Sequence, residues 1–165
     1  LLIYKKNSLT GKYEYSDKVE TSHTKTIRFM EFSPDEKLLA VASFDSTIGI
    51  FQWEDGLLDQ VQTIEGHESE VKSVSWHMGK NRLATCSRDK SVWVWEYNEE
   101  FEFGVVAVIN AHSQDIKSVK WIPSRNLLTS CSYDESIRIW SPEGETEDEE
   151  EYLCLQTLKV ILKGC

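Results

Sequence analysis

Three histidine–aspartate pairs form a recurring pattern in this sequence of 165 residues. The histidine precedes the aspartate by 22 residues in each pair, and the pairs are His23 with Asp45, His67 with Asp89, and His112 with Asp134. A histidine beside a carboxylate can transfer protons in catalysis, or it can hold a buried hydrogen bond. A catalytic triad needs one such site, whereas this pair recurs three times, so the pattern favours a structural role.

The pairs recur with a period of 44 or 45 residues, and other positions follow the same period. An aromatic residue lies six positions after each aspartate, and these residues are Phe51, Trp95 and Trp140. We expect a network of histidine, aspartate, hydroxyl and indole groups in the later units, formed by His67, Asp89, Thr85 and Trp95, and by His112, Asp134, Ser130 and Trp140. The first unit keeps His23 and Asp45, but Val41 and Phe51 take the other two places, so its network should be shorter.

Each unit contains four short stretches that are typical of β-strands. The first stretch follows the histidine, the second is the most apolar, the third ends at the aromatic residue, and the fourth is more polar. In the three units these stretches cover 27–32, 38–42, 47–51 and 58–64; 71–76, 83–86, 92–95 and 103–109; and 116–121, 127–131, 137–140 and 152–158. Four strands per repeat of about 44 residues predict an all-β fold of β-propeller blades, with the polar fourth strand at the outer edge.

The repeats resemble WD repeats. The resemblance rests on Gly66-His67, on Ala111-His112 and on the spacing from aspartate to aromatic residue, although Gln52, Glu96 and Ser141 stand where the WD dipeptide has aspartate. We expect the end of a preceding blade and a first outer strand over 1–22, WD repeats over 23–66, 67–111 and 112–158, and an atypical tail over 159–165. The chain would then be a partial ring of a seven-bladed propeller, with about three complete four-stranded blades. It would be a fragment, a truncated product or half of a split ring.

Longer segments resemble one family within the WD-repeat proteins, the WD-repeat subunits of the cytosolic iron–sulfur protein assembly (CIA) targeting complex. These segments include LATCSRDKSVWVWE at 83–96, HSQDIKSVKW at 112–121 and SYDESIRIW at 132–140. The resemblance implies a scaffold without enzymatic activity or bound cofactor, which helps to deliver iron–sulfur clusters to cytosolic and nuclear apoproteins. Its partners would be the other subunits of the targeting complex and the client proteins, in the cytoplasm and also in the nucleus. The alternative is a generic WD-repeat scaffold that binds peptides or proteins in another complex.

Charge and cysteine content exclude several other classes. The chain has 18 Lys and Arg against 28 Asp and Glu, a net charge of −10, and seven of the acidic residues lie in a loop at 143–151. This balance argues against nucleic-acid binding, and the sequence has neither a membrane-spanning apolar stretch nor a signal peptide. The four cysteines, Cys86, Cys131, Cys154 and Cys165, lack metal-ligand spacing, so we expect free thiols and no metal site.

A protein-binding surface is expected on the face that bears the histidines and the aspartate turns, because a propeller holds its loops rigidly there. Its residues would be Phe44, Arg88 and Tyr133, which precede the aspartates, and Arg28, Lys72 and Lys117, which follow the histidines by five positions. Arg88 matches, by the resemblance, a surface arginine implicated in the iron–sulfur function of the family. Since Lys72 and Lys117 are its neighbours on this face, we expect its charge not to be cancelled locally. The alternative is that the two aromatic residues cover turn backbone and that the cations pair with Glu70 and Asp115.

Overall fold

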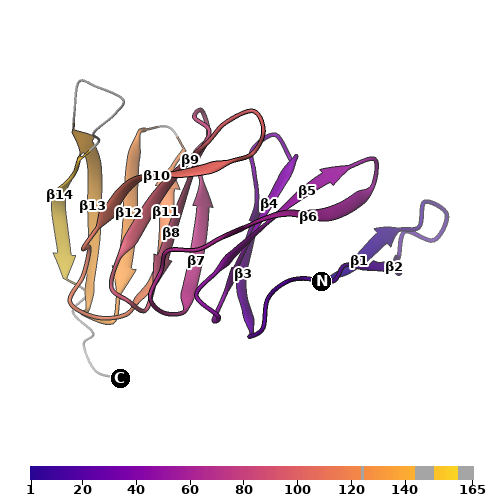
Figure 1. Cartoon of the computed structure of the whole chain (residues 1–165), viewed down its shortest axis with the longest axis horizontal. Helices are drawn as coiled ribbons and strands as arrows, with labels where there is room; N and C mark the ends of the chain where they lie inside the picture. Colours follow the sequence, from indigo (N-terminus) through magenta and orange to yellow (C-terminus); the bar gives the residue numbers. More distant parts are fainter. Residues whose placement is uncertain (124, 144–150, 160–165) are drawn as a thin grey trace.

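The computed structural model describes residues 1–123, 125–143 and 151–159. Within these ranges the regular structure is β-sheet, arranged as three four-stranded antiparallel sheets that lie side by side and one two-stranded hairpin (Figure 1). This confirms the all-β, blade-like fold. Most of the expected acidic loop, nearly all of the expected tail, and Cys165 lie outside the described residues. No helix in the described part of the chain is long and apolar enough to cross a membrane.

The chain enters each sheet at its first strand and leaves at its fourth, so strand order follows sequence order. The hairpin consists of β1 (Leu2–Lys6) and β2 (Tyr13–Lys18). Blade one contains β3 (Ile27–Phe32), β4 (Leu38–Ser43), β5 (Ile48–Glu54) and β6 (Leu57–Ile64). Blade two contains β7 (Val71–Trp76), β8 (Arg82–Ser87), β9 (Val92–Tyr97) and β10 (Phe103–Ile109). Blade three contains β11 (Ile116–Ile122), β12 (Leu127–Ser132), β13 (Ser136–Glu143) and β14 (Glu151–Lys159).

The second strands β4 and β8 are buried along their whole length, as their continuous apolar sequences indicate. A tight turn joins the second strand of each blade to the third, and it carries the aspartate of the repeat. The residue after each aspartate has a positive φ: 77° at Ser46, 74° at Lys90 and 61° at Glu135. Each aspartate accepts a hydrogen bond from the backbone N–H two residues later, which stabilises this conformation in the turn.

Neighbouring blades pack face to face through apolar side chains. Ile48 and Ile50 of blade one lie against Val74 and Trp76 of blade two. The indole of Trp76 also donates a hydrogen bond of 2.8 Å to a blade-one backbone carbonyl. A second cluster joins blades two and three through Cys86, Val92, Val94, Val119, Trp121 and Trp140. The repeated interface holds the three sheets at a fixed spacing, and therefore also the turns that they carry.

The β1–β2 hairpin covers the other face of blade one. Ile3 and Val19 pack against the buried Leu39, Val41 and Phe51. In the order of the repeat, β1 and β2 stand where the third and fourth strands of another blade would stand. The expectation that residues 1–22 hold the end of a preceding blade stays a prediction.

Candidate functional site

Blade two holds the predicted polar network in a single line of hydrogen bonds. His67 Nδ1 lies 2.7 Å from Asp89 Oδ2, and His67 Nε2 lies 2.8 Å from Thr85 Oγ1. The indole Nε1 of Trp95 donates to the same Thr85 oxygen at 3.0 Å. All the bonds are satisfied if the Thr85 hydroxyl donates to Nε2 and Nδ1 donates to the carboxylate.

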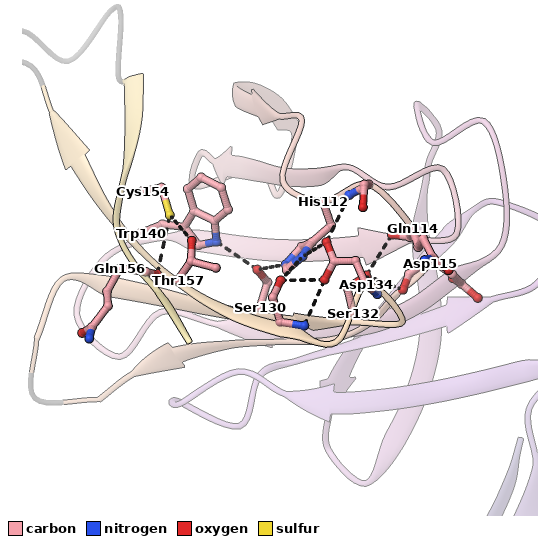
Figure 2. Close-up of polar contacts among 12 residues, drawn as sticks. His112, Gln114, Asp115, Ser130, Ser132, Asp134, Trp140, Cys154, Gln156 and Thr157 are labelled. Carbon is pink, nitrogen blue, oxygen red and sulfur yellow. Dashed lines mark hydrogen bonds and ion pairs between the residues drawn. The ribbon is translucent and has the colours of Figure 1, made fainter. Parts of the chain in front are cut away.

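Blade three repeats this arrangement with a serine in place of the threonine. Figure 2 shows the side chains of His112, Asp134, Ser130 and Trp140 joined in one network. His112 Nδ1 lies 2.9 Å from Asp134 Oδ2, its Nε2 lies 2.7 Å from Ser130 Oγ, and Trp140 Nε1 donates to Ser130 Oγ at 2.9 Å. The four groups that the sequence predicts to interact therefore do form a network in both blades.

Blade one has the shorter network that its sequence indicates. His23 Nδ1 is 3.2 Å from Asp45 Oδ2 and 3.1 Å from Thr47 Oγ1. Its Nε2 is buried and has no hydrogen-bond partner among the described residues. Val41 and Phe51, which occupy the places of the hydroxyl and the indole, cannot provide one.

Two further sets of hydroxyl residues, which were not predicted from the sequence, complete these networks. One set follows each aspartate by two positions and donates to its Oδ1: Thr47, Ser91 and Ser136. The other set precedes each aspartate by two positions and accepts a hydrogen bond from its backbone N–H: Ser43, Ser87 and Ser132. Both sets recur with the period of 44 and 45 residues, and this periodicity is the sequence signal for them.

The aspartates of the three turns stay ionised under ordinary conditions. Burial raises the pKa of Asp89, but hydrogen bonds from His67 and Ser91 outweigh this effect, and the resulting pKa lies well below its usual range. The pKa values of Asp45 and Asp134 are lowered in the same way by several donors. Burial lowers the pKa of His112, and the hydrogen bond to Asp134 opposes this only in part.

This chemistry suits a structural role better than catalysis. The side chains of His67 and His112 are 0% exposed, so a substrate cannot reach either imidazole. Their polar atoms are already paired with groups of the same blade. Among residues 1–123, 125–143 and 151–159, no three His, Cys, Asp or Glu side chains are grouped to hold a metal ion. Cys86, Cys131 and Cys154 are free thiols.

The face with the aspartate turns carries pairs of aromatic and basic side chains. Lys72 Nζ of blade two lies 4.0 Å from the ring centroid of Phe44 in blade one. Lys117 Nζ lies 4.1 Å from the ring centroid of Tyr133 in its own blade. Such cation–π contacts orient the ammonium groups, while Tyr133 remains 64% exposed. The exposed Arg28 lies at the corresponding position of blade one.

The structure corrects the expectation for the charge of Arg88. Its Nη1 donates to Glu70 Oε1 at 3.0 Å, so an acidic neighbour does balance this cation. The contact arises because the backbone N–H of Arg88 donates to the Glu70 carbonyl, which brings residues 18 positions apart side by side. Ser69, the Glu70 backbone amide and Arg88 together lower the pKa of Glu70 to about 2, so its carboxylate is ionised at neutral pH. Lys117 similarly pairs with Asp115.

Arg88 nevertheless remains accessible. Its side chain is 61% exposed, and only one of its nitrogens contacts Glu70. The guanidinium has five N–H donors, so several stay open to another group. The face therefore combines a partly paired arginine with two oriented lysines and an exposed tyrosine, and of these residue types arginine and tyrosine are enriched at protein interfaces.

Several curated relatives that this chain matches are named for cytosolic iron–sulfur protein assembly. A "Probable cytosolic iron-sulfur protein assembly protein CIAO1 homolog" of Caenorhabditis elegans is 46% identical over 90 residues, which is 54% of this chain and 27% of that protein. A "Probable cytosolic iron-sulfur protein assembly protein 1" of Kluyveromyces lactis is 46% identical over 88 residues, covering 48% of this chain and 26% of the relative. A Schizosaccharomyces pombe protein named as a probable cytosolic Fe-S cluster assembly factor is 44% identical over 98 residues, covering 59% and 16%. The chain thus spans about a quarter or less of the length of these relatives.

The family model "WD domain, G-beta repeat" matches residues 16–52, 58–96 and 103–141. The second match runs from the outer strand of blade one through the first three strands of blade two, and the third is shifted in the same way. A family repeat is therefore offset by one strand from a structural blade. The matches cover more than half of the sequence, and the chain belongs to the WD40-repeat family.

Proposed function

We propose that this chain is part of a non-catalytic scaffold in cytosolic iron–sulfur protein assembly, and that it helps to deliver clusters to cytosolic and nuclear apoproteins through protein contacts. The observation that carries the proposal is the identity of 44–46% to several relatives named for this assembly. The proposed compartment is the cytoplasm, which is the one given in the relatives' names, and the nucleus in addition.

The buried networks support a scaffold role. In blades two and three each histidine is hydrogen-bonded to the second strand and to the aspartate of the turn. Serine hydroxyls accept further hydrogen bonds from the backbone of that turn. Satisfied buried polar groups favour a single arrangement of the backbone. The turns can therefore present side chains to a partner with little loss of conformational freedom on binding.

The proposed contact surface is the face with the aspartate turns. Its residues are Arg28, Phe44, Lys72, Arg88, Lys117 and Tyr133. Arg and Tyr are frequent anchors at protein interfaces, and an arginine with free donors can bind a carboxylate of a partner. The other subunits of the targeting complex and the client proteins are the proposed partners.

The test uses the complete protein that contains this chain, expressed with an affinity tag in a cell that carries the assembly machinery. The substitution Arg88→Gln removes the charge without placing a second acid beside Glu70. The matched control is Lys37→Gln, because Lys37 is 68% exposed and lies at the other end of blade one, in the turn between β3 and β4. Co-purification of assembly subunits and the activity of a cytosolic iron–sulfur enzyme are measured.

We expect the unsubstituted protein and Lys37→Gln to recover the assembly subunits, and Arg88→Gln to recover fewer or to lower the activity of the client enzyme. Thermal midpoints of the two variants should agree closely, because an exposed ion pair contributes about 0–1 kcal/mol. If the unsubstituted protein recovers other clients and no assembly subunit, it is a scaffold of another complex. If both variants behave alike, Arg88 is not part of the contact surface.

A further inference from the structure

The outer strand of blade two differs in composition from the other outer strands. Between Phe103 and Ile109, β10 reads FGVVAVI and contains no charged or polar side chain. In contrast, β6 includes Asp59 and two glutamines, and β14 includes charged residues at both ends. The expectation of a more polar fourth strand is therefore wrong for blade two. Proteins usually protect sheet edges with charges, and the sequence of β10 offers none.

The edge of β10 is accessible. Val105 and Val108 are 51% and 49% exposed. β10 pairs with β9 on one side, and within the described residues no backbone hydrogen bond reaches its other side. An edge strand directs alternate N–H and C=O groups outward, so β10 offers free donors and acceptors along an apolar strand.

Nothing among the described residues requires a glycine at position 104. Its φ is not in the left-handed region, and a Cβ built on it would meet no atom within 4 Å. A glycine in a strand lowers its stability, and such a residue often marks a place where another backbone approaches closely. Gly49 and Gly66, in contrast, are each tightly packed against side chains of their own chain.

An acidic groove adjoins this part of β10. The groove has a volume of about 510 Å³ and is lined by Glu96, Tyr97, Asn98, Glu102, Gly104, Val105 and Val106. The segment 96–102 contains four glutamates and no basic residue. Arg82 forms an ion pair with Glu96, while the neutral Asn98 donates a hydrogen bond to Glu102. The segment therefore keeps a negative net charge even with Arg82 counted.

We propose that the edge of β10 binds an extended segment of a partner protein, which adds a fifth strand to blade two. The segment would carry apolar, β-branched side chains that pack beside Val105 and Val108, and a lysine or arginine that enters the groove between Glu96 and Glu102. Main-chain hydrogen bonds give affinity in this mode of recognition, and side-chain pockets give specificity. The proposal does not depend on a role in iron–sulfur protein assembly, because its residues lie on the rim of the blade and not on the face with the aspartate turns.

The test measures binding of two synthetic eight-residue peptides to this chain by fluorescence anisotropy. Both peptides alternate valine and threonine; one has lysine at each end and the other has glutamate at each end. Hydrogen exchange then locates the bound peptide on the chain. The blocking variant is Val105→Lys, which places a charge on the exposed edge. The matched control is Val61→Lys on β6, where the side chain is 44% exposed on the outer strand of blade one.

We expect the lysine peptide to protect the amides of residues 103–109 from exchange. Val105→Lys should weaken its binding about tenfold or more, and Val61→Lys should change it less than about twofold. The glutamate peptide should bind at least about tenfold more weakly than the lysine peptide, because the four glutamates of segment 96–102 repel its carboxylates. Far-UV circular dichroism checks that both variants remain folded.

Three results would overturn the proposal. One is the absence of protection at residues 103–109, and another is equal weakening by Val105→Lys and Val61→Lys. The third is concentration-dependent self-association, without peptide binding, that Val105→Lys abolishes. In that case a second copy of the chain occupies the edge of β10 instead of a partner segment.

Discussion

The indole of Trp93 occupies the space that a side chain at Gly66 would need. A Cβ built on Gly66 would lie 2.7 Å from Cζ3 of Trp93 and 3.0 Å from Cη2 of Trp95. The two indoles stack with their centroids 5.1 Å apart, and Trp93 also lies against the ring of His67. Gly66 and the two tryptophans therefore form one packing unit beside the polar network of blade two.

Gly66→Ala should destabilise the chain by about 1–3 kcal/mol, because the new methyl group forces the stacked indoles to move. Blade three suggests a test of this cause. It has Ala111 in the place of Gly66 and Arg138 in the place of Trp93. Chemical denaturation is the measurement. In the double variant Gly66→Ala, Trp93→Arg the cost of the alanine should be smaller than in Gly66→Ala alone. Additive effects of the two substitutions would contradict the steric explanation.

Asp89→Ala should cost about 1–3 kcal/mol of unfolding free energy, because it leaves buried donors of His67 and Ser91 without an acceptor. Asp45→Ala should cost less. His23 holds Asp45 by a longer contact, 3.2 Å against 2.7 Å, and its Nε2 is already unpaired. Denaturation of the two variants under the same conditions gives the order. Equal or reversed losses would contradict the difference between the networks.

Acid should weaken the fold in two stages. Burial depresses the pKa of His112 below its ordinary value of 6.5, so the unfolded chain binds a proton first as the pH falls below 6.5. The folded-state pKa values of Asp45, Asp89 and Asp134 are also depressed, and their contribution is lost as the pH falls below the ordinary value of 3.8. Unfolding free energies measured from pH 8 to pH 2 should fall first below pH 6.5 and again below pH 3.8. In His112→Gln the decrease just below pH 6.5 should be smaller, and a rise in stability from pH 7 to pH 5 would contradict the assignment.

The sequence predicted those parts of the site that repeat. The period of 44 and 45 residues placed each histidine, aspartate, hydroxyl and indole of blades two and three in one network, because each group occupies a fixed place in the strand order. The sequence offered the pairing of Arg88 with Glu70 only as the alternative to an uncancelled charge, and the structure bears out that alternative. That contact joins residues 18 positions apart across the end of the β7–β8 pair, and blade one has Thr26 where blade two has Glu70. The apolar β10 departs from the repeat in a similar way, since β6 has Asp59 and two glutamines at the corresponding place.

Val41→Thr should complete the network of blade one. Val41 lies at the position of Thr85 and Ser130, is 0% exposed, and stands in the same blade as the unpaired Nε2 of His23. A threonine there has nearly the shape of valine and brings a hydroxyl to the place from which Thr85 reaches His67.

A buried hydroxyl without a partner costs about 1–3 kcal/mol. The matched control is Val94→Thr, because Val94 is also 0% exposed and lies in an apolar cluster. Val94→Thr should therefore lose about this much, whereas Val41→Thr should lose less or gain stability, since its hydroxyl satisfies an imidazole nitrogen that is already buried. Chemical denaturation of both variants measures the difference, and His23→Ala combined with Val41→Thr tests its source. Equal losses for the two threonine variants would show that the hydroxyl at position 41 does not reach His23.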